Sequence, residues 1–445
     1  MHKDQTLNLA VPAASPAGNV VVAMLFVGLM FFILGCATWL NGSLIPFLKI
    51  VCNLNNFQSL WVTFAFYIAY TLMALPSAAV LRRVGYKNGM SLGLAIMGLG
   101  ALLFIPAARS SWYSLFLLAL FTLASGMTLM QTAINPYIVC IGARESAAMR
   151  ISIMGFFNKT AGVLVPLAFS SMMLSGISRY SDAALATLDA AASAALRSEL
   201  GQRLEFPYAA MAAGLFAIAV VVRFSPLREI PEEAEVGGHS GSHWGVLQFP
   251  QLVLGALALF VYVGVEVIAG DTIGLYGRSL RVENFGVLTS YTMAFMMAGY
   301  VVGIVAVPRW LSQKHALLLS ALCGMVFSFG VTQGSSVGSA LSSAMLGWAG
   351  VPAVPDTVMF LAMLGFANAL VWPAIWPLAL NGLGKYTASG SALLIMGIAG
   401  GALLPMIYGH LSDLSSSQAA YWVLLPCYAM ILFYAVKGHK MTSWR

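Results

Sequence analysis

The chain has 445 residues, of which 60% are hydrophobic and 8% are charged, and its mean hydropathy is +0.86. Soluble globular proteins carry about 25% charged residues, so this composition excludes that class and predicts a polytopic membrane protein. A net charge of +7 would favour binding of nucleic acid only if it formed a basic surface on a soluble protein, so we expect no nucleic-acid partner.

Apolar segments of the length that a transmembrane helix needs, about 20 residues, follow one another along the chain. They are too long for barrel strands and lack alternation with a period of two. The predicted fold class is therefore an all-α membrane protein with twelve transmembrane helices. The predicted spans are 20–47, 57–81, 88–108, 112–141, 150–174, 207–223, 247–276, 286–307, 315–334, 356–381, 387–411 and 419–438.

The residues before Gly18 are mixed and polar, so we expect no cleavable signal and a first helix that stays in place. Lys and Arg are retained on the cytoplasmic side of a membrane. With a cytoplasmic N-terminus, most of the 22 Lys and Arg residues fall on that side. Both termini are therefore expected in the cytoplasm.

Two stretches interrupt the apolar pattern. The segment 176–206 has helical propensity and mixed charge, and it predicts an amphipathic helix lying over the outer mouth. The segment 224–245 combines Pro226 and Pro231 with acidic residues and glycines, which is typical of a flexible linker. We therefore divide the chain into an N-terminal six-helix half, 1–223, a cytoplasmic linker, 224–245, and a C-terminal six-helix half, 246–445.

The two halves repeat each other in order. Three pairs of segments correspond: Ala133-Ile134-Asn135-Pro136 with Ala374-Ile375-Trp376-Pro377, Gly162 to Pro166 with Gly401 to Pro405, and the loop from Arg82 to Lys87 with the loop from Arg309 to Lys314. Two pseudo-symmetric halves of six helices are typical of the major facilitator fold, which binds substrate near the membrane midplane between them.

Three motifs carry a closer resemblance. They are Trp39-Leu40-Asn41-Gly42 in the first span, Gln131-Thr132-Ala133-Ile134-Asn135-Pro136-Tyr137 in the fourth, and the run from Gly400 to Asp413 in the eleventh. These motifs resemble the fucose permease and glucose/galactose permease family of sugar symporters. The resemblance implies sugar import across a bacterial inner membrane, with a monosaccharide and the lipid bilayer as partners.

Two departures from that family concern its acids. Fucose permeases place an Asp after the first-span Leu-Asn and a Glu before the fourth-span Thr-Ala, where this chain has Gly42 and Gln131. Neither residue titrates, so this pair cannot couple a proton. In the seventh span the chain instead has Glu266, where fucose permease has Gln, and Asp271 follows five residues later. An acid at the bilayer centre costs about 2.5–3.5 kcal/mol, so we predict Glu266 and Asp271 as ion-coupling candidates.

Alternatives remain for each charged group. Glu266 becomes neutral when it is protonated or cation-paired, which would let the site close, but it could instead pair structurally with Lys159 or cap a broken helix. Lys159 lies nine residues from Arg150, which favours snorkelling to the inner surface over a salt bridge. Asp271 is near the outer end of its span, where a solvated or gating role is expected. The coupling ion is a proton or sodium, with the proton favoured, and the only metal considered is sodium at Glu266.

Sugar recognition requires amides for the hydroxyl groups and aromatic rings for the C–H face. The predicted substrate-binding residues are Asn41, Gln131, Asn135, Asn158, Tyr262, Asn368, Trp372 and Trp376. An Asn within a span could instead hold two helices together, and a Trp could simply pack. The scattered cysteines indicate neither a disulfide framework nor a metal site.

The sequence therefore predicts a monomeric, cation-coupled importer of a hexose or N-acetylhexosamine that works by alternating access. It predicts no cofactor and no enzymatic activity, since no HExxH motif is present. A sugar uniporter without ion coupling and a non-transporting membrane sensor are the alternatives.

Overall fold

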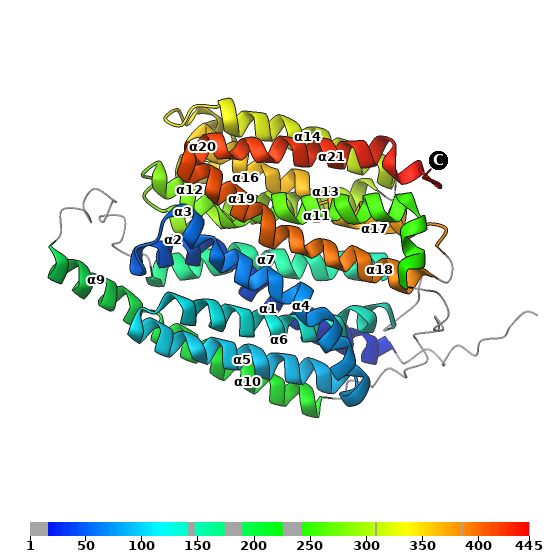
Figure 1. Cartoon of the computed structure of the whole chain (residues 1–445), viewed down its shortest axis with the longest axis horizontal. Coiled ribbons are helices and arrows are strands. Elements are labelled where there is room, and N and C mark those ends of the chain that lie inside the picture. The colour runs from blue at the N-terminus through cyan, green and yellow to red at the C-terminus, as the bar shows by residue number, and fades with distance from the viewer. Residues whose placement is uncertain are drawn as a thin grey trace, which may run out of the picture.

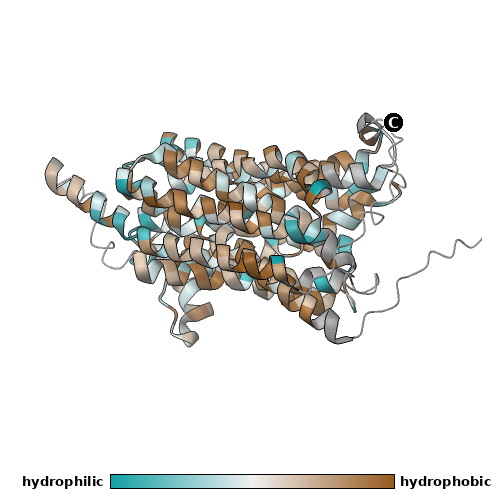
Figure 2. Cartoon of the chain, turned by 90° about the horizontal axis from the view of Figure 1, so that it is seen from below, coloured by the Kyte–Doolittle hydropathy of each residue, from teal (hydrophilic) through white to brown (hydrophobic). Residues whose placement is uncertain are grey.

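The computed structural model describes residues 17–140, 147–173, 189–225, 243–307, 309–383 and 386–444. Within them, twelve helical segments are long and apolar enough to cross a membrane, as predicted. The helices run side by side in one elongated bundle (Figure 1). Figure 2 shows that apolar residues dominate along these helices. This arrangement is that of a multi-pass membrane protein.

The helices of the first half follow the predicted spans closely. They are α1 (Ala17–Trp39), α2 (Asn41–Val51), α3 (Asn56–Ser59), α4 (Trp61–Val84), α5 (Tyr86–Ser110), α6 (Tyr113–Cys140), α7 (Ala147–Met173), α9 (Ala190–Gln202) and α10 (Glu205–Phe224).

The second half contains both long helices and short connecting turns. The elements are η4 (His243–Gln248), α11 (Pro250–Asp271), α12 (Ile273–Ser279), η5 (Phe285–Val287), α13 (Leu288–Ala306), α14 (Gln313–Gln333), α15 (Ala340–Leu346), η6 (Gly347–Ala349), α16 (Asp356–Asn368), α17 (Val371–Leu380), α18 (Thr387–Met396), η8 (Gly397–Ala399), α19 (Gly400–Leu414), α20 (Ser417–Ala420), η9 (Tyr421–Val423), α21 (Leu424–Val436) and η10 (Gly438–Lys440).

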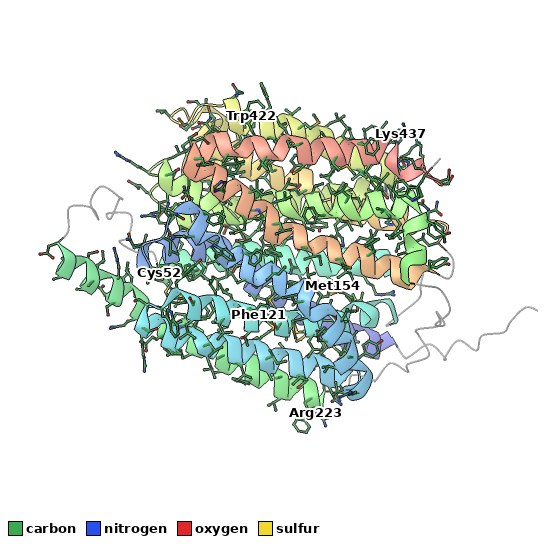
Figure 3. The ribbon with its side chains drawn as sticks, in the orientation of Figure 1. Cys52, Phe121, Met154, Arg223, Trp422 and Lys437 are labelled. Carbon is green, nitrogen blue, oxygen red and sulfur yellow. The ribbon has the colours of Figure 1, made fainter. Side chains whose placement is uncertain are left out.

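The two ends of the bundle are distinct. Both described chain ends lie at one end, which we call the terminal end, whereas α2, α3 and α12 lie at the opposite, far end (Figure 1). Figure 3 places Lys437 at the terminal end and Cys52 at the far end. An even number of spans returns the chain to the side on which it began.

Three of the spans are interrupted near candidate residues. The break between α1 and α2 falls at Leu40, the break between α11 and α12 at Thr272, and the break between α16 and α17 at Ala369 and Leu370. Backbone hydrogen bonds continue across the breaks, from Leu44 N–H to the Leu40 carbonyl and from Tyr276 N–H to the Thr272 carbonyl. The candidate residues that flank the breaks, Asn41, Asp271 and Asn368, are buried inside the bundle.

The predicted outer helix is present in part, but its predicted placement is wrong. Residues 176–188 lie outside the described residues, and α9 extends past the far end of the bundle instead of across it (Figures 1 and 2). Arg203 and Leu204 keep right-handed helical backbone angles, so α9 continues the direction of α10. Its C-terminal part packs against the bundle: Leu196 is partly buried against the core, Leu200 is buried, and Gly201 approaches the Ala108 carbonyl. Most of the predicted linker, residues 226–242, also lies outside the described residues.

Candidate functional site

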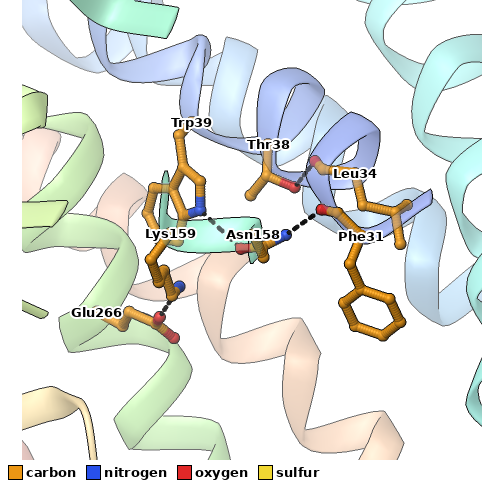
Figure 4. A network of polar contacts seen from close by, with 7 residues as sticks. All are labelled: Phe31, Leu34, Thr38, Trp39, Asn158, Lys159 and Glu266. Carbon is orange, nitrogen blue, oxygen red and sulfur yellow. Dashed lines mark hydrogen bonds and ion pairs between the residues drawn. The ribbon is translucent and has the colours of Figure 1, made fainter. Parts of the chain in front are cut away.

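A buried ion pair joins the two halves of the molecule. Lys159 Nζ on α7 lies 2.9 Å from Glu266 Oε1 on α11 (Figure 4), and their side chains are 7% and 13% exposed. A buried charge is tolerated when it is paired and hydrogen-bonded, and each group here supplies the other's partner. Neutralisation of these two buried charges therefore depends on the contact between the halves.

Aromatic and amide groups hold the lysine in place. Lys159 Nζ lies 3.9 Å from the centroid of the Trp39 ring, within range of a cation–π interaction. Trp39 Nε1 donates to Asn158 Oδ1 at 3.1 Å, and Asn158 Nδ2 donates to the Phe31 carbonyl at 3.3 Å (Figure 4). Elements α1, α7 and α11 thus meet in one polar network.

The expectation that Lys159 snorkels to the inner surface is wrong. Its ammonium is buried against Trp39 and bonded to Glu266, so it points into the bundle. Snorkelling keeps the charged head of a lysine in water, and the sequence could not show that α11 brings a carboxylate to this face of α7. The contact of Glu266 with Lys159 that the sequence analysis raised is therefore present.

A cluster of aromatic rings lies beside this pair in the second half. Tyr262 lies one helical turn before Glu266 and is buried, and its ring centroid is 6.3 Å from that of Trp372. The Trp372 and Trp376 rings are 5.6 Å apart, so the two side chains share one side of α17, as predicted. We call Tyr262, Trp372 and Trp376 the aromatic cluster.

Two N–H donors near this cluster have no partner in the described part of the chain. Asn368 Oδ1 accepts a hydrogen bond from the Tyr428 hydroxyl at 2.8 Å, but Asn368 Nδ2 is buried and unpaired. Trp376 Nε1 is also buried and unpaired. Buried hydrogen-bond donors nearly always have a partner. These two donors are therefore candidates for binding a ligand that carries acceptor oxygens.

The candidate substrate-binding residues of the first half differ from one another in burial and in hydrogen bonding. Asn41 is 1% exposed and its Nδ2 has no partner among the described residues, whereas Gln131 is half-buried. Asn135 has an exposed side chain and is not brought into the buried centre. Both amide atoms of Asn158 are bonded to Trp39 and Phe31, so in this conformation it holds helices together.

The packing around Gly42 leaves no room for the Asp that fucose permeases have at this position. A Cβ at this position would overlap Thr289 Oγ1 and would lie 2.6 Å from the Gly270 carbonyl oxygen. Thr289 Oγ1 itself donates to that carbonyl at 2.8 Å. No side chain fits here, so the acid of the resembling family is excluded from this arrangement by the contact between α2, α11 and α13.

Asp271 is fully buried, so the expected solvated position at the end of its span is wrong. It is 0% exposed, and Thr63 Oγ1 donates to its Oδ2 at 3.2 Å. The cause is that α11 does not end in solvent: the chain continues directly into α12, which packs on α2, and Gly274 approaches the Gly42 carbonyl. The gating alternative for Asp271 remains.

Tyr428 and Thr63 are site neighbours that the sequence did not single out. Tyr428 lies 60 residues from Asn368 in the chain and Thr63 lies 208 residues from Asp271, so no local spacing connects them. A Thr within an apolar span is common and carries no signal of its own. Only the arrangement of the helices could have identified them.

One segment has the residue spacing of a catalytic motif but does not lie in the structural setting that the motif requires. Residues 334–338 read Gly-Ser-Ser-Val-Gly, which has the spacing of a nucleophile elbow. Such an elbow joins a strand to a helix, whereas this segment lies between the helices α14 and α15. Among the described residues, no group of three or more His, Cys, Asp or Glu side chains could hold a metal ion.

Comparison with known proteins agrees with this architecture. Residues 27–405 match the model of the Major Facilitator Superfamily. The chain is 33% identical to the glucose/galactose transporter of Brucella abortus, over 95% of each chain, and 25% identical to the L-fucose-proton symporter of Escherichia coli, over 91% of this chain and 90% of that one. The crystal structure of FucP in the outward conformation superposes with a TM-score of 0.67 at 23% identity, covering 94% of this chain and 98% of that chain.

These matches confirm the resemblance that the first, fourth and eleventh spans predicted, and they confirm the predicted fold class. The relatives are transporters and not enzymes, as expected. The chain belongs to the Major Facilitator Superfamily.

Proposed function

We propose that this protein is a cation-coupled sugar importer of the bacterial inner membrane, which moves a hexose or an N-acetylhexosamine by alternating access. Its relatives are named as glucose/galactose transporters and L-fucose-proton symporters, which supports a sugar as the substrate. In this proposal the terminal end faces the cytoplasm and the far end faces outward. Residues 1–223 and 246–445 rock against each other as a monomer, joined by the linker at 224–245.

The aromatic cluster and its unpaired donors support the sugar site. Asn368 Nδ2 and Trp376 Nε1 can donate to hydroxyl or acetamido oxygens, while the ring faces take the C–H side of the sugar. Asn41 adds an unpaired donor from the other half, and Gln131 lies half-buried on α6. A substrate that satisfied donors from both halves would favour closure, because each unpaired buried donor costs about 1–3 kcal/mol.

The Lys159–Glu266 pair is the single observation that carries ion coupling. A carboxylate between the halves must be neutralised for the centre to close, and here the ammonium of Lys159 does this at 2.9 Å. We propose that a coupling cation takes the place of Lys159 at Glu266 when sugar is carried. Lys159 returns after the cation leaves, so that the empty carrier can also close.

A proton is favoured over sodium as that cation. A single carboxylate binds a proton without help, whereas sodium is a hard cation that favours several oxygen ligands. One oxygen of Glu266 accepts from the ammonium of Lys159, and Tyr262 lies one turn away. Relatives from Escherichia coli and Haemophilus influenzae are named as proton symporters.

Uptake of labelled glucose and N-acetylglucosamine into proteoliposomes tests this proposal, with proton and sodium gradients imposed separately. We expect one gradient to drive accumulation of the sugar in the wild type, and Glu266→Gln to leave only equilibration. Glu205→Gln is the matched control, because it removes a carboxylate from an exposed ion pair with Arg109. If neither gradient matters and Glu266→Gln behaves as wild type, the pair is structural and the protein is a uniporter.

A further inference from the structure

Hydrogen bonds between the halves gather on the far side of the ion pair. Ser43 Oγ donates to the Gly286 carbonyl at 2.6 Å, and the backbone N–H groups of Asn56 and Phe57 donate to the Asp413 carboxylate at 3.1 and 2.8 Å. We call this contact the far gate. Its members are Ser43, Asn56, Phe57 and Thr63 in the first half and Asp271, Gly286, Ser412 and Asp413 in the second.

One member of the far gate is a carboxyl group without a charge partner. Asp271 is 0% exposed, its Oδ2 accepts a bond from Thr63, and its Oδ1 has no partner among the described residues. Thr63 is itself fully buried on α4, in the opposite half. The carboxyl group therefore lies in the closed contact, away from water.

The ionisable groups that act on Asp271 are Glu266 on its own helix and Tyr67 on α4. Glu266 lies five residues away, about 7.5 Å along the helix axis, and a negative charge there repels a second one. The ammonium of Lys159 is bonded to Glu266. No cation among the described residues forms an ion pair with Asp271.

An ionised carboxylate in this place would lose its hydration and gain only one neutral hydrogen bond. That exchange is strongly unfavourable, whereas a protonated carboxyl group needs far less solvation. A metal ion would require more oxygen ligands than Thr63 and Asp271 provide. The closed contact therefore fits a neutral, protonated acid.

We propose that Asp271 is a second proton-binding site, at which a proton taken from the far side is required for the far gate to close. The proton binds the carboxylate while the gate is open and remains on the carboxyl group while the gate is closed. It returns to the far side when the gate reopens, so it is not carried across and does not enter the ratio of ion to sugar.

The proposal rests on the proposed function only in that the chain works by alternating access. Glu266 would bind the ion that is transported, whereas Asp271 would set how readily the outer side opens. The two roles separate experimentally, because one concerns accumulation of sugar and the other concerns access to buried positions.

Access to the far gate can be measured at Leu60. This residue is 0% exposed, at the start of α4, and it faces Gly409 of the other half. Leu60→Cys, in a background with the native cysteines replaced, is labelled by a membrane-impermeant maleimide in right-side-out vesicles at a series of external pH values. Leu414→Cys, at a side chain that is 71% exposed, supplies the reactivity of an open thiol for normalisation.

We expect normalised labelling of Leu60→Cys to rise by up to about tenfold per pH unit, because opening releases one proton. Asp271→Asn should hold the gate closed and remove that dependence. Glu266→Gln should keep it, even though accumulation of sugar is lost. If Asp271→Asn keeps the pH dependence of the parent, or if the parent shows none, the proposal is overturned.

Thr63→Val is a second test of the proposal, which applies even if the Asp271→Asn protein fails to fold. It keeps the acid but removes its hydrogen bond, so labelling should be about fivefold faster at each pH with an unchanged slope. Unchanged labelling in Thr63→Val would contradict the role of this contact. A result in which Glu266→Gln abolishes accumulation while Asp271→Asn leaves gating unaltered would support the proposed function and reject only this inference.

Discussion

Removing the ammonium of Lys159 is the sharpest perturbation of the buried centre. Lys159→Met keeps a long unbranched side chain but leaves the Glu266 carboxylate, 13% exposed, without its partner at 2.9 Å. Breaking a buried pair from one side costs about 3–5 kcal/mol of folding stability. Loss of the interaction with Trp39, at 3.9 Å, adds about 0.5–2 kcal/mol.

The double variant separates the lost pair from the unpaired charge. In Lys159→Met with Glu266→Gln no charge remains, so we expect most of the lost stability to return, apart from the Trp39 contribution. The assay is thermal unfolding of the detergent-solubilised variants, followed by intrinsic fluorescence.

Two results would refute this reasoning. One is a Lys159→Met protein as stable as the wild type. The other is a double variant whose loss equals the sum of the two single losses, because additive losses mean that the two groups do not interact.

Further variants test the sugar site and the far gate. Trp372→Ala should raise the KM for sugar about tenfold or more through the loss of a ring face, whereas Trp372→Phe should change it much less; equal effects would exclude ring stacking. Asn368→Ala should lower stability by about 1–3 kcal/mol, because the Tyr428 hydroxyl loses its partner, and thermal unfolding measures this; Tyr428→Phe together with Asn368→Ala should recover part of the loss. Asp413→Asn should speed labelling of Leu60→Cys several-fold by weakening bonds to Asn56 and Phe57, and an unchanged rate would remove Asp413 from the gate. Glu205→Gln should leave the melting temperature unchanged, because its ion pair with Arg109 is solvated.

The membrane fold could be predicted from the sequence because its cause is local. Each span needs about 20 apolar residues, and composition alone shows where those residues are. The division into two halves followed from repeated pairs such as Pro136 with Pro377. The placement of α9 was wrong, because its direction depends on two backbone angles at Arg203 and Leu204 that composition does not reveal.

The candidate site could be predicted only as a set of residue types. Glu266 stood out as an acid in an apolar run, and Trp372 and Trp376 as rings four residues apart, which share a helix face. The partners of these residues could not be predicted. Lys159 lies 107 residues from Glu266 and Thr63 lies 208 residues from Asp271, so only the packing of α7 and α4 against α11 brings them together.

The central claim is that Glu266 exchanges Lys159 for a coupling proton when sugar moves. The most direct measurement is the external pH of lightly buffered, de-energised vesicles after addition of a transported sugar, for the wild type and Glu266→Gln. The account predicts alkalinisation with the wild type, and none with Glu266→Gln even though labelled sugar still exchanges. Equal alkalinisation in both proteins would contradict it, because the transported proton would then bind elsewhere.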